Sequence, residues 1–258
     1  MMKLIRRASY LWDLLRTLVI RDMKVKYEGT LLGFAWTLIN PLLFVGVFYF
    51  VFQVVLSLDI RRYSSFALIG FLVYNWFRGS LAQASTTIKN DRALLRRPGF
   101  LVAVLPAIAV ITNLIHFLLA VPILAIFLAF DGHQIGISTA ILPAVIAIQF
   151  VFTLSLAYLV AAANTFFRDV GHILTAILGL GMFLTPIFYD YSSVPPEFET
   201  LYNVNPLVPL LDAYRAVLIG GAQVNWASLG TVGVVSLILF YVGHKVFAYA
   251  GYRFVEKT

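Results

Sequence analysis

Long apolar stretches alternate with short polar segments along most of the chain. An α-helix rises about 1.5 Å per residue, so about 20 predominantly apolar residues cross the hydrocarbon core of a membrane. The pattern therefore predicts an all-α integral membrane protein with a single transmembrane domain over residues 1–258. Six transmembrane helices are expected, at residues 31–56, 66–86, 100–130, 137–163, 173–189 and 227–249.

The segment before the first span, residues 9–27, has apolar residues on one helical face and charges toward the other. The apolar face carries leucines, namely Leu11, Leu14, Leu15 and Leu18. A helix of this kind buries one face at the membrane boundary without crossing the membrane. We therefore expect an N-terminal amphipathic interfacial helix at residues 9–27.

The connection between the fifth and sixth spans, residues 190–226, is too long for a plain loop. After two prolines, residues recur in it at helical spacing, namely Leu207, Leu210, Leu211, Tyr214 and Leu218. A short helix that re-enters the membrane is tolerated where protein shields the ends of its backbone. This segment predicts re-entrant outer helices.

Basic residues predict the orientation in the membrane. Most of the 19 Lys and Arg residues fall in the N-terminal segment, in the loops after the second and fourth spans, and in the C-terminal tail. The opposite side carries Arg61, Arg62 and Arg215, and Arg78 lies inside the second span. Because cytoplasmic loops are enriched in Lys and Arg, both termini are predicted to be cytoplasmic, in a multi-pass protein of the cytoplasmic (inner) membrane.

Composition narrows the class of function. The chain is 61% hydrophobic and 12% charged, with a mean hydropathy of +0.90, which excludes an ordinary soluble domain. Cytoplasmic loops account for the net charge of +7, so no nucleic-acid partner is expected. There is no cysteine, which excludes disulfides and thiolate metal sites. No cleavable signal is evident, and the first span is expected to act as the insertion signal.

The sequence offers no energy source for transport. All 12 acidic residues lie in surface segments, loops or the tail, whereas ion-coupled carriers hold ionisable groups at mid-membrane. There is no G-x-x-x-x-G-K-[ST] phosphate loop that would bind ATP. The energy for transport must therefore come from a partner protein.

The histidines lie in different segments and lack metal-ligand spacing, so no metal site is predicted; they are His116, His133, His172 and His244. His116 and Asn113, inside the third span, are either a polar channel lining or groups that hydrogen-bond between helices. The second interpretation is favoured.

A set of short stretches carries a family resemblance. They are RDMKVKY at 21–27, LGFAW at 32–36, NPL at 40–42, NTFFRDV at 164–170, NPL at 205–207 and the pair Tyr214 and Arg215. Together they resemble the membrane subunits of ATP-binding-cassette exporters for polysaccharides and polyol phosphates, the permeases of O-antigen, teichoic-acid and capsule export. Each stretch alone is a weak signal, but their joint order and spacing over nearly the whole chain are specific.

The resemblance implies a homodimer that docks on two copies of a nucleotide-binding ATPase subunit. ATP and Mg²⁺ are expected on that partner, and no cofactor is expected in this chain. A cytoplasmic coupling helix is expected between spans two and three, at residues 88–99. The residues expected to couple to the ATPase are Lys89, Asp91, Arg92, Leu94, Arg96, Arg97, Arg168 and Asp169.

The charge pattern agrees with such a helix over Lys89 to Arg97. Asp91 near its start and Arg96 near its end suit the helix dipole, and Pro98 with Gly99 ends it. The alternative is a basic loop that merely follows the charge rule for membrane orientation. Arg168 and Asp169 are alternatively a surface ion pair, worth less than about 1 kcal/mol.

Aromatic residues on three spans are expected to line the substrate channel, because sugar rings stack their C–H faces on aromatic rings. They are Phe44, Phe48, Tyr49, Phe52, Tyr74, Trp76, Phe77, Phe183, Phe188 and Tyr189, joined by Arg78, which suits a phosphate group. The alternative is an aromatic belt at the membrane interface and lipid-facing Phe, with Arg78 extending its charge to the interface.

The resulting hypothesis is the transmembrane subunit of an exporter that moves a lipid-linked polysaccharide across the inner membrane. The pyrophosphate end of the lipid is expected at the basic inner surface, formed by Arg16, Arg21, Lys24 and Lys26. The alternative is a drug or lipid efflux permease on the same scaffold. An integral-membrane enzyme is a third class, but it needs a His or carboxylate pair at one depth, and the sequence has none.

Overall fold

The computed structural model describes residues 2–30, 32–57, 60, 62–96, 100–133, 136–167, 169–220 and 223–254. Throughout these ranges the regular structure is helical, with no strand. The prediction of an all-α protein is confirmed.

Four segments of the described chain are long and apolar enough to cross a membrane: Trp36–Val55, Val104–Phe130, Ser138–Phe166 and Trp226–Ala250. They contain α2 (Trp36–Tyr49) with a π-helical continuation (Phe50–Val55), α5 (Val104–Phe130), α6 (Leu142–Phe166) after a 3-10 turn (Ile137–Ile141), and α10 (Trp226–Phe254). The first and third spans therefore begin later than residues 31 and 100. Short turns precede both helices.

The two other expected spans are helical but differ from the four. One is α3 (Tyr63–Asn90), which is long yet more polar than the four apolar segments. The other is α7 (Val170–Leu184), which has 15 residues and stops before the expected end at 189. Thr185 has extended backbone angles and precedes Pro186, and a residue before proline disfavours the helical conformation. The count of six spans stays a prediction.

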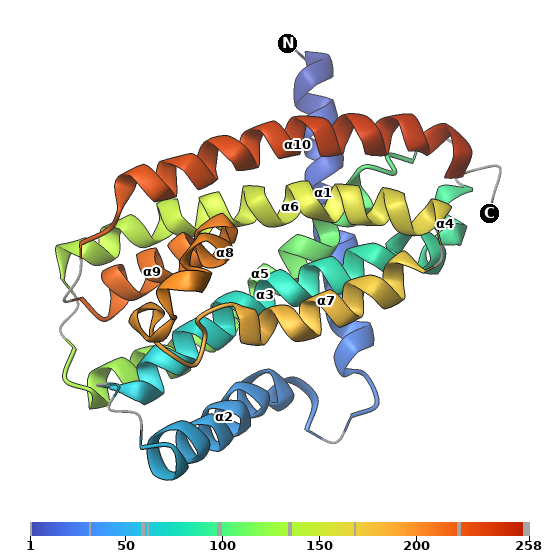
Figure 1. Cartoon of the computed structure of the whole chain (residues 1–258). Helices are drawn as coiled ribbons and strands as arrows, with labels where there is room; N and C mark the ends of the chain where they lie inside the picture. Colours follow the sequence, from blue (N-terminus) through green and yellow to red (C-terminus); the bar gives the residue numbers. More distant parts are fainter. Residues whose placement is uncertain are drawn as a thin grey trace.

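At the centre of the bundle, α3 packs against α2, α5, α6 and α7. Figure 1 shows α10 running along α6, with α3 and α7 on the other side of α6. A Cβ atom on Gly243 of α10 would lie 2.7 Å from the carbonyl oxygen of Ser155 on α6. A glycine is therefore needed where these two helices meet.

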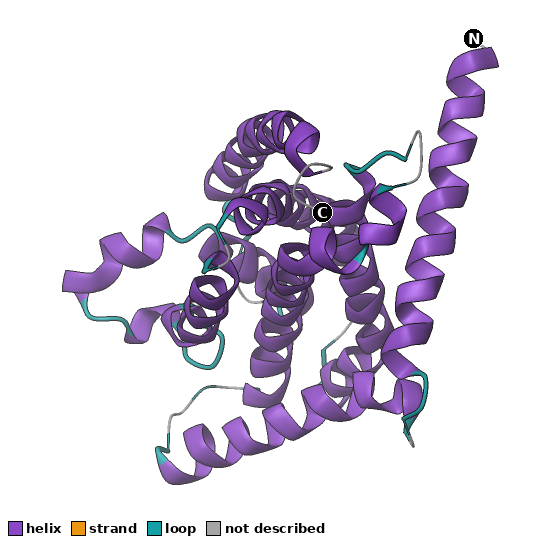
Figure 2. Ribbon diagram, turned by 90° about the vertical axis from the view of Figure 1, so that its right-hand side faces the viewer, coloured by secondary structure: helices purple, strands orange, loops and turns teal. Residues whose placement is uncertain are grey.

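The N-terminal helix α1 (Met2–Tyr27) crosses the direction of the bundle helices in Figure 1 and stands along one side of the bundle in Figure 2. It begins before residue 9, so the predicted start is wrong. The leucines of its predicted apolar face pack on the protein core, with Leu18 buried and Leu11, Leu14 and Leu15 partly buried. The interfacial position of this helix in a membrane stays a prediction. Trp12, off that face, is exposed.

The segment between α7 and α10 folds into two 3-10 turns (Tyr191–Ser193 and Pro196–Phe198) and the short helices α8 (Glu199–Val204) and α9 (Leu207–Leu218). The helix α9 covers the residues predicted to be helical here, whereas their re-entry into the membrane stays a prediction. Its expected inner face is buried at four positions and partly buried at Leu218; the four are Leu207, Leu210, Leu211 and Tyr214.

The bundle has two ends of different construction. In Figure 1, the one-turn helix α4 (Arg92–Leu95), the connection from α6 to α7 and the last turn of α10 lie at the right-hand end, while α8 and α9 lie toward the left. These first three segments, all expected on the cytoplasmic side, thus gather at one end. Those expected outside lie toward the other.

Candidate functional site

The turn between α3 and α5 differs from the expected coupling helix. Lys89 belongs to the last turn of α3, and the chain then turns at Asp91 before the single turn α4. The amides of Leu94 and Leu95 bond to the Asp91 carbonyl oxygen, at 2.9 and 3.3 Å, so Asp91 begins the new turn. A continuous helix from Lys89 to Arg97 is therefore wrong, because the backbone reorganises at Asp91.

The remaining residues of that turn have distinct environments. Leu95 is buried and Leu94 partly buried, which holds α4 on the bundle, whereas Arg96 reaches solvent. Arg97 and the side chain of Arg92 lie outside the described residues.

An ion pair joins this turn to α1. The Nη2 atom of Arg21 lies 2.8 Å from Oδ1 of Asp91, and the same guanidinium donates to Oδ1 of Asp22 at 2.8 and 3.1 Å. The Asp91 side chain is only 15% exposed. Its pKa is raised, because loss of water around the carboxylate outweighs the attraction of Arg21. The contact fixes the position of α1 on the turn.

The ion pair continues into a chain of hydrogen bonds that we call the polar network: Arg21, Asp22, Gln83, Asp91 and Asn113. Nε2 of Gln83 on α3 donates to Oδ2 of Asp22 at 3.1 Å, and Nδ2 of Asn113 on α5 donates to Oε1 of Gln83 at 2.8 Å. The network therefore joins α1, α3, α5 and the turn. It confirms the interhelical interpretation of Asn113.

Close packing around Asn113 depends on a glycine. A Cβ atom on Gly79 would lie 2.5 Å from Oδ1 of Asn113. The side chain of Asn113 thus fits against α3 only because position 79 is a glycine.

The second predicted contact, at the connection from α6 to α7, is anchored by Asn164. Its Nδ2 donates to the carbonyl oxygen of Ser85 on α3 at 2.6 Å, and its Oδ1 accepts from the amide of Gly171 at 3.0 Å. Asn164 is 1% exposed. Asp169 at the start of α7 is exposed, and Arg168 lies outside the described residues. The buried Asn164 explains how this exposed corner is held.

The basic residues of the predicted inner surface lie in three environments. Arg16 and Lys24 are exposed on α1, while Arg21 is paired with carboxylates. Lys26 lines a cavity of about 110 Å³ where α1, α2, α3 and α5 meet. Lys26 is exposed overall, but loss of water where it lines this cavity lowers its pKa. Of the four cations, Arg21 thus serves the coupling turn through its carboxylate partners.

Hydrogen bonds close one wall of this inner cavity. The Tyr27 hydroxyl is within hydrogen-bond distance of Nδ1 of His116, at 3.0 Å, and of the Thr37 hydroxyl. The end of α1 is thereby tied to α2 and α5. His116, like Asn113, serves contacts between helices.

The predicted channel aromatics separate into buried and accessible sets. Four pack inside the bundle, and we leave them out of any lining; they are Tyr74, Trp76, Phe77 and Phe188. Phe48 and Phe52 are partly buried, and the Phe48 ring stacks on Phe188 with centroids 3.5 Å apart. These rings hold α2 on the bundle.

The accessible set is smaller. Phe44, Tyr49 and Phe183 are 41%, 46% and 60% exposed, and these three keep the predicted lining role as a prediction. Tyr189 is half-buried and bonds to the Tyr202 hydroxyl at 2.6 Å. Arg78 is half-buried near the middle of α3.

Arg215 is a functional candidate that sequence reasoning counted only as a cation of the outer side, without predicting its burial. It is only 8% exposed, its guanidinium carbon lies 3.4 Å from the centroid of the Phe66 ring, and its Nη2 donates to the Ile187 carbonyl oxygen at 2.9 Å. A Cβ atom on Gly70 would lie 2.8 Å from that same oxygen. The sequence did mark Arg215 in one way, because the pair Tyr214 and Arg215 is among the stretches that carry the family resemblance.

Comparison with known proteins bears on the whole chain. Residues 13–219 match the family model described as ABC-2 type transporter. The O-antigen export system permease protein RfbA of Myxococcus xanthus is 33% identical over the full length of both chains. Two proteins of the same description from Klebsiella pneumoniae are 29% identical over 96% of each chain, and 28% identical over 99% of this chain and 98% of the relative.

Proposed function

The chain belongs to the ABC-2 type transporter family, and from that membership we propose that it exports a lipid-linked polysaccharide of the O-antigen, teichoic-acid or capsule type. It is a multi-pass membrane transport subunit and not an enzyme. The observation that carries the polysaccharide substrate is the full-length similarity to permeases whose names specify O-antigen export. We place both termini in the cytoplasm and the protein in the inner membrane.

We propose that a separate ATPase subunit binds ATP and Mg²⁺ and docks at the end of the bundle that carries α4 and Asp169. The support is local: α4 is a one-turn helix held on the bundle by Leu95, and Asp169 is an exposed carboxylate at the start of α7. Movement of the docked subunit displaces α4. The ion pair of Arg21 with Asp91 passes this displacement to α1.

The polar network then couples the displacement to the bundle, because Asp22 reaches α3 and Gln83 reaches α5. Since α1 also carries Arg16 and Lys24 in solvent, ATP turnover moves the surface that meets anionic lipid phosphates. The proposed role of α1 is to join recognition of the lipid end to the ATPase cycle.

We further propose a homodimer with the path between the two copies. Among the four membrane-length segments, the one with α2 buries the smallest share of its residues. Val47 and Phe50 in this segment are exposed apolar residues, and so are Leu180 and Phe183 on α7. These apolar faces suit contact with a second copy or with lipid.

A deletion and a pull-down test the proposed function. Loss of the chain should leave lipid-linked polysaccharide inside the cell, accessible to a polysaccharide-specific antibody only after the inner membrane is permeabilised. The tagged full chain should co-purify an ATPase subunit. Unchanged surface polysaccharide together with new sensitivity to drugs would favour an efflux permease and contradict the proposal.

A further inference from the structure

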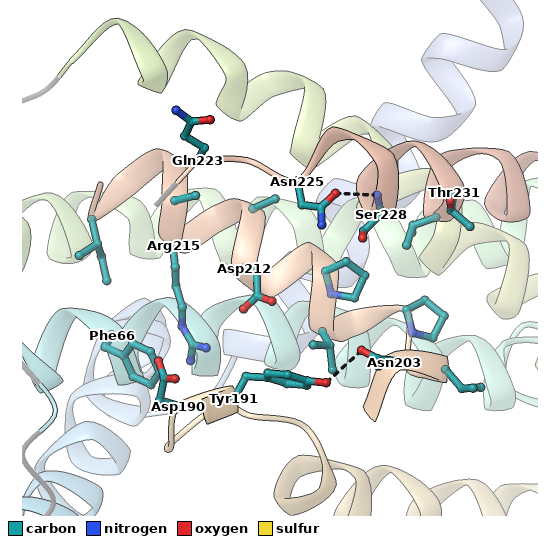
Figure 3. A pocket seen from close by; sticks show the side chains of 18 of the residues that line it. Phe66, Asp190, Tyr191, Asn203, Asp212, Arg215, Gln223, Asn225, Ser228 and Thr231 are labelled. Carbon is teal, nitrogen blue, oxygen red and sulfur yellow. Dashed lines mark hydrogen bonds between the residues drawn. The ribbon is translucent and has the colours of Figure 1, made fainter. Parts of the chain in front are cut away.

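A cavity of about 780 Å³ opens at the end of the bundle that is opposite the coupling turn. Its walls come from α8, α9, the segment after α7 and the start of α10, as Figure 3 shows. This volume falls within the range of about 300 to 1,000 Å³ that is typical of small-molecule sites. We call it the outer cavity, and its polar wall includes Asp190, Tyr191, Asn203, Asp212, Arg215 and Asn225.

Two amides in the wall are already oriented. Oδ1 of Asn203 accepts from the Tyr191 hydroxyl at 3.0 Å, and Oδ1 of Asn225 accepts from the amide of Ser228 at 3.1 Å. These bonds use the oxygens, and among the described residues no partner is found for the two amide nitrogens. Both nitrogens are therefore available as donors to a ligand.

Two charged groups in the wall also have atoms that make no hydrogen bond within the described residues. The Asp212 carboxylate, on α9, accepts no hydrogen bond from the described residues, and Figure 3 shows it pointing toward Tyr191. Nε of Arg215 is buried with no partner in the described chain, although the residue is 8% exposed.

The charges select the class of ligand. Asp190 and Asp212 together outweigh the single charge of Arg215, so the wall repels phosphate and other anions. The guanidinium, in turn, opposes a metal cation. A sugar satisfies both conditions, because its hydroxyls donate to carboxylates and accept from amides while its C–H faces pack on apolar surfaces such as Tyr191 and Pro209.

We propose that the outer cavity binds a neutral sugar unit of the exported polysaccharide as the chain emerges. The proposal rests on the proposed function and adds a second point of contact, far from the lipid end. A weak sugar site at the exit holds the emerging chain while the ATPase resets. Backward sliding is thereby reduced.

The test uses the full chain with its ATPase subunit in lipid nanodiscs. The probe is the host's own polysaccharide, freed of lipid by mild acid, and binding is followed by saturation-transfer NMR. Asp212→Asn and the exposed-rim variant Asn203→Ala should each weaken binding about tenfold. Glu197→Gln changes an exposed carboxylate outside the cavity and should leave binding unchanged.

Thermal unfolding checks that each variant is folded, and Asn203→Ala serves as the main variant if Asp212→Asn is not. Equal binding by wild type and the cavity variants, no binding by wild type, or displacement of the sugar by inorganic phosphate would each overturn the proposal. Failure of the proposed function looks different, since it leaves surface polysaccharide unchanged when the whole chain is deleted.

Discussion

Charged residues at the two ends of the bundle are held in opposite ways. At the coupling end, Arg21 and Asp91 form a partly exposed ion pair between separate helices. At the outer end, Arg215 is buried, stacked on Phe66 and bonded to a backbone carbonyl. Exposed ion pairs contribute little to stability, whereas removing the partner of a buried cation strongly destabilises the fold. The comparison indicates that the coupling end is suited to move and the outer end to stay fixed.

The largest expected effect is on the outer side, from Arg215→Ala. The variant leaves the Ile187 carbonyl oxygen without its donor and removes the packing on Phe66, so we expect the free energy of unfolding to fall by about 2 to 3 kcal/mol. Thermal unfolding of the purified protein measures this change. Arg16→Ala removes an exposed cation and serves as the control, with a change within about 0.5 kcal/mol. Equal stability of both variants would contradict a rigid outer end.

Gly70→Ala should have the next largest effect. The new methyl group would lie 2.8 Å from the Ile187 carbonyl oxygen and 3.1 Å from Nη2 of Arg215, and such overpacking costs about 1 to 3 kcal/mol. The matched control is Gly230→Ala in α10, where a Cβ atom meets nothing within 4 Å. That change should be neutral or stabilising, because Ala favours helix over Gly. A loss of stability in the control alone would reverse this interpretation.

Asp91→Arg should separate transport from stability. Stability should fall somewhat, because the Asp91 side chain is only 15% exposed and an arginine there faces Arg21. Polysaccharide export per ATP hydrolysed by the folded protein should fall much further, because α1 no longer follows the turn. The double variant with Arg21→Asp re-forms the pair and should recover part of the export. Asp13→Arg changes an exposed residue of α1 by the same charge and serves as the control. Normal export by Asp91→Arg would refute coupling through this contact.

The smallest expected effect is a dependence on pH. The Asp91 pKa is raised above its ordinary value of 3.8 by desolvation, so the folded protein binds this proton more tightly than the unfolded chain does. The contribution to stability is present below the ordinary pKa and is lost as pH rises through the folded value. The stability of wild type relative to Asp91→Asn should therefore decrease as pH rises through the folded pKa of Asp91, measured by unfolding curves of both proteins. An increase in this difference with pH would give the shift the opposite sign.

Much of the helical framework is predictable from local pattern. Apolar runs located α2, α5, α6 and α10, and spacing alone identified the buried face of α9 and the leucine face of α1. Hydropathy reports the preference of each residue for lipid, and these elements depend chiefly on that preference. Even the early end of α7 has a local cause, in the proline that follows Thr185.

The candidate sites depend on partners that are distant in the sequence. The Asp91 turn contacts Arg21, which is 70 positions away, and Asn113 reaches α1 only through Gln83. Arg215 resembles any other outer cation until the ring of Phe66 and the carbonyl of Ile187 are placed beside it. Patterns along a chain do not report such pairings. The coupling role of this segment stays a prediction, and neither its break at Asp91 nor its contact with Arg21 was predicted.

The early end of α7 also affects the lipid around the protein. Fifteen helical residues extend over about 22 Å, less than the roughly 30 Å of a typical hydrocarbon core. Beyond Leu184 the chain continues as a non-helical segment, in which Thr185, Ile187 and Phe188 are buried in the protein. Bilayers of short-chain lipids should match this side of the protein better than long-chain bilayers, so its activity should depend on acyl-chain length.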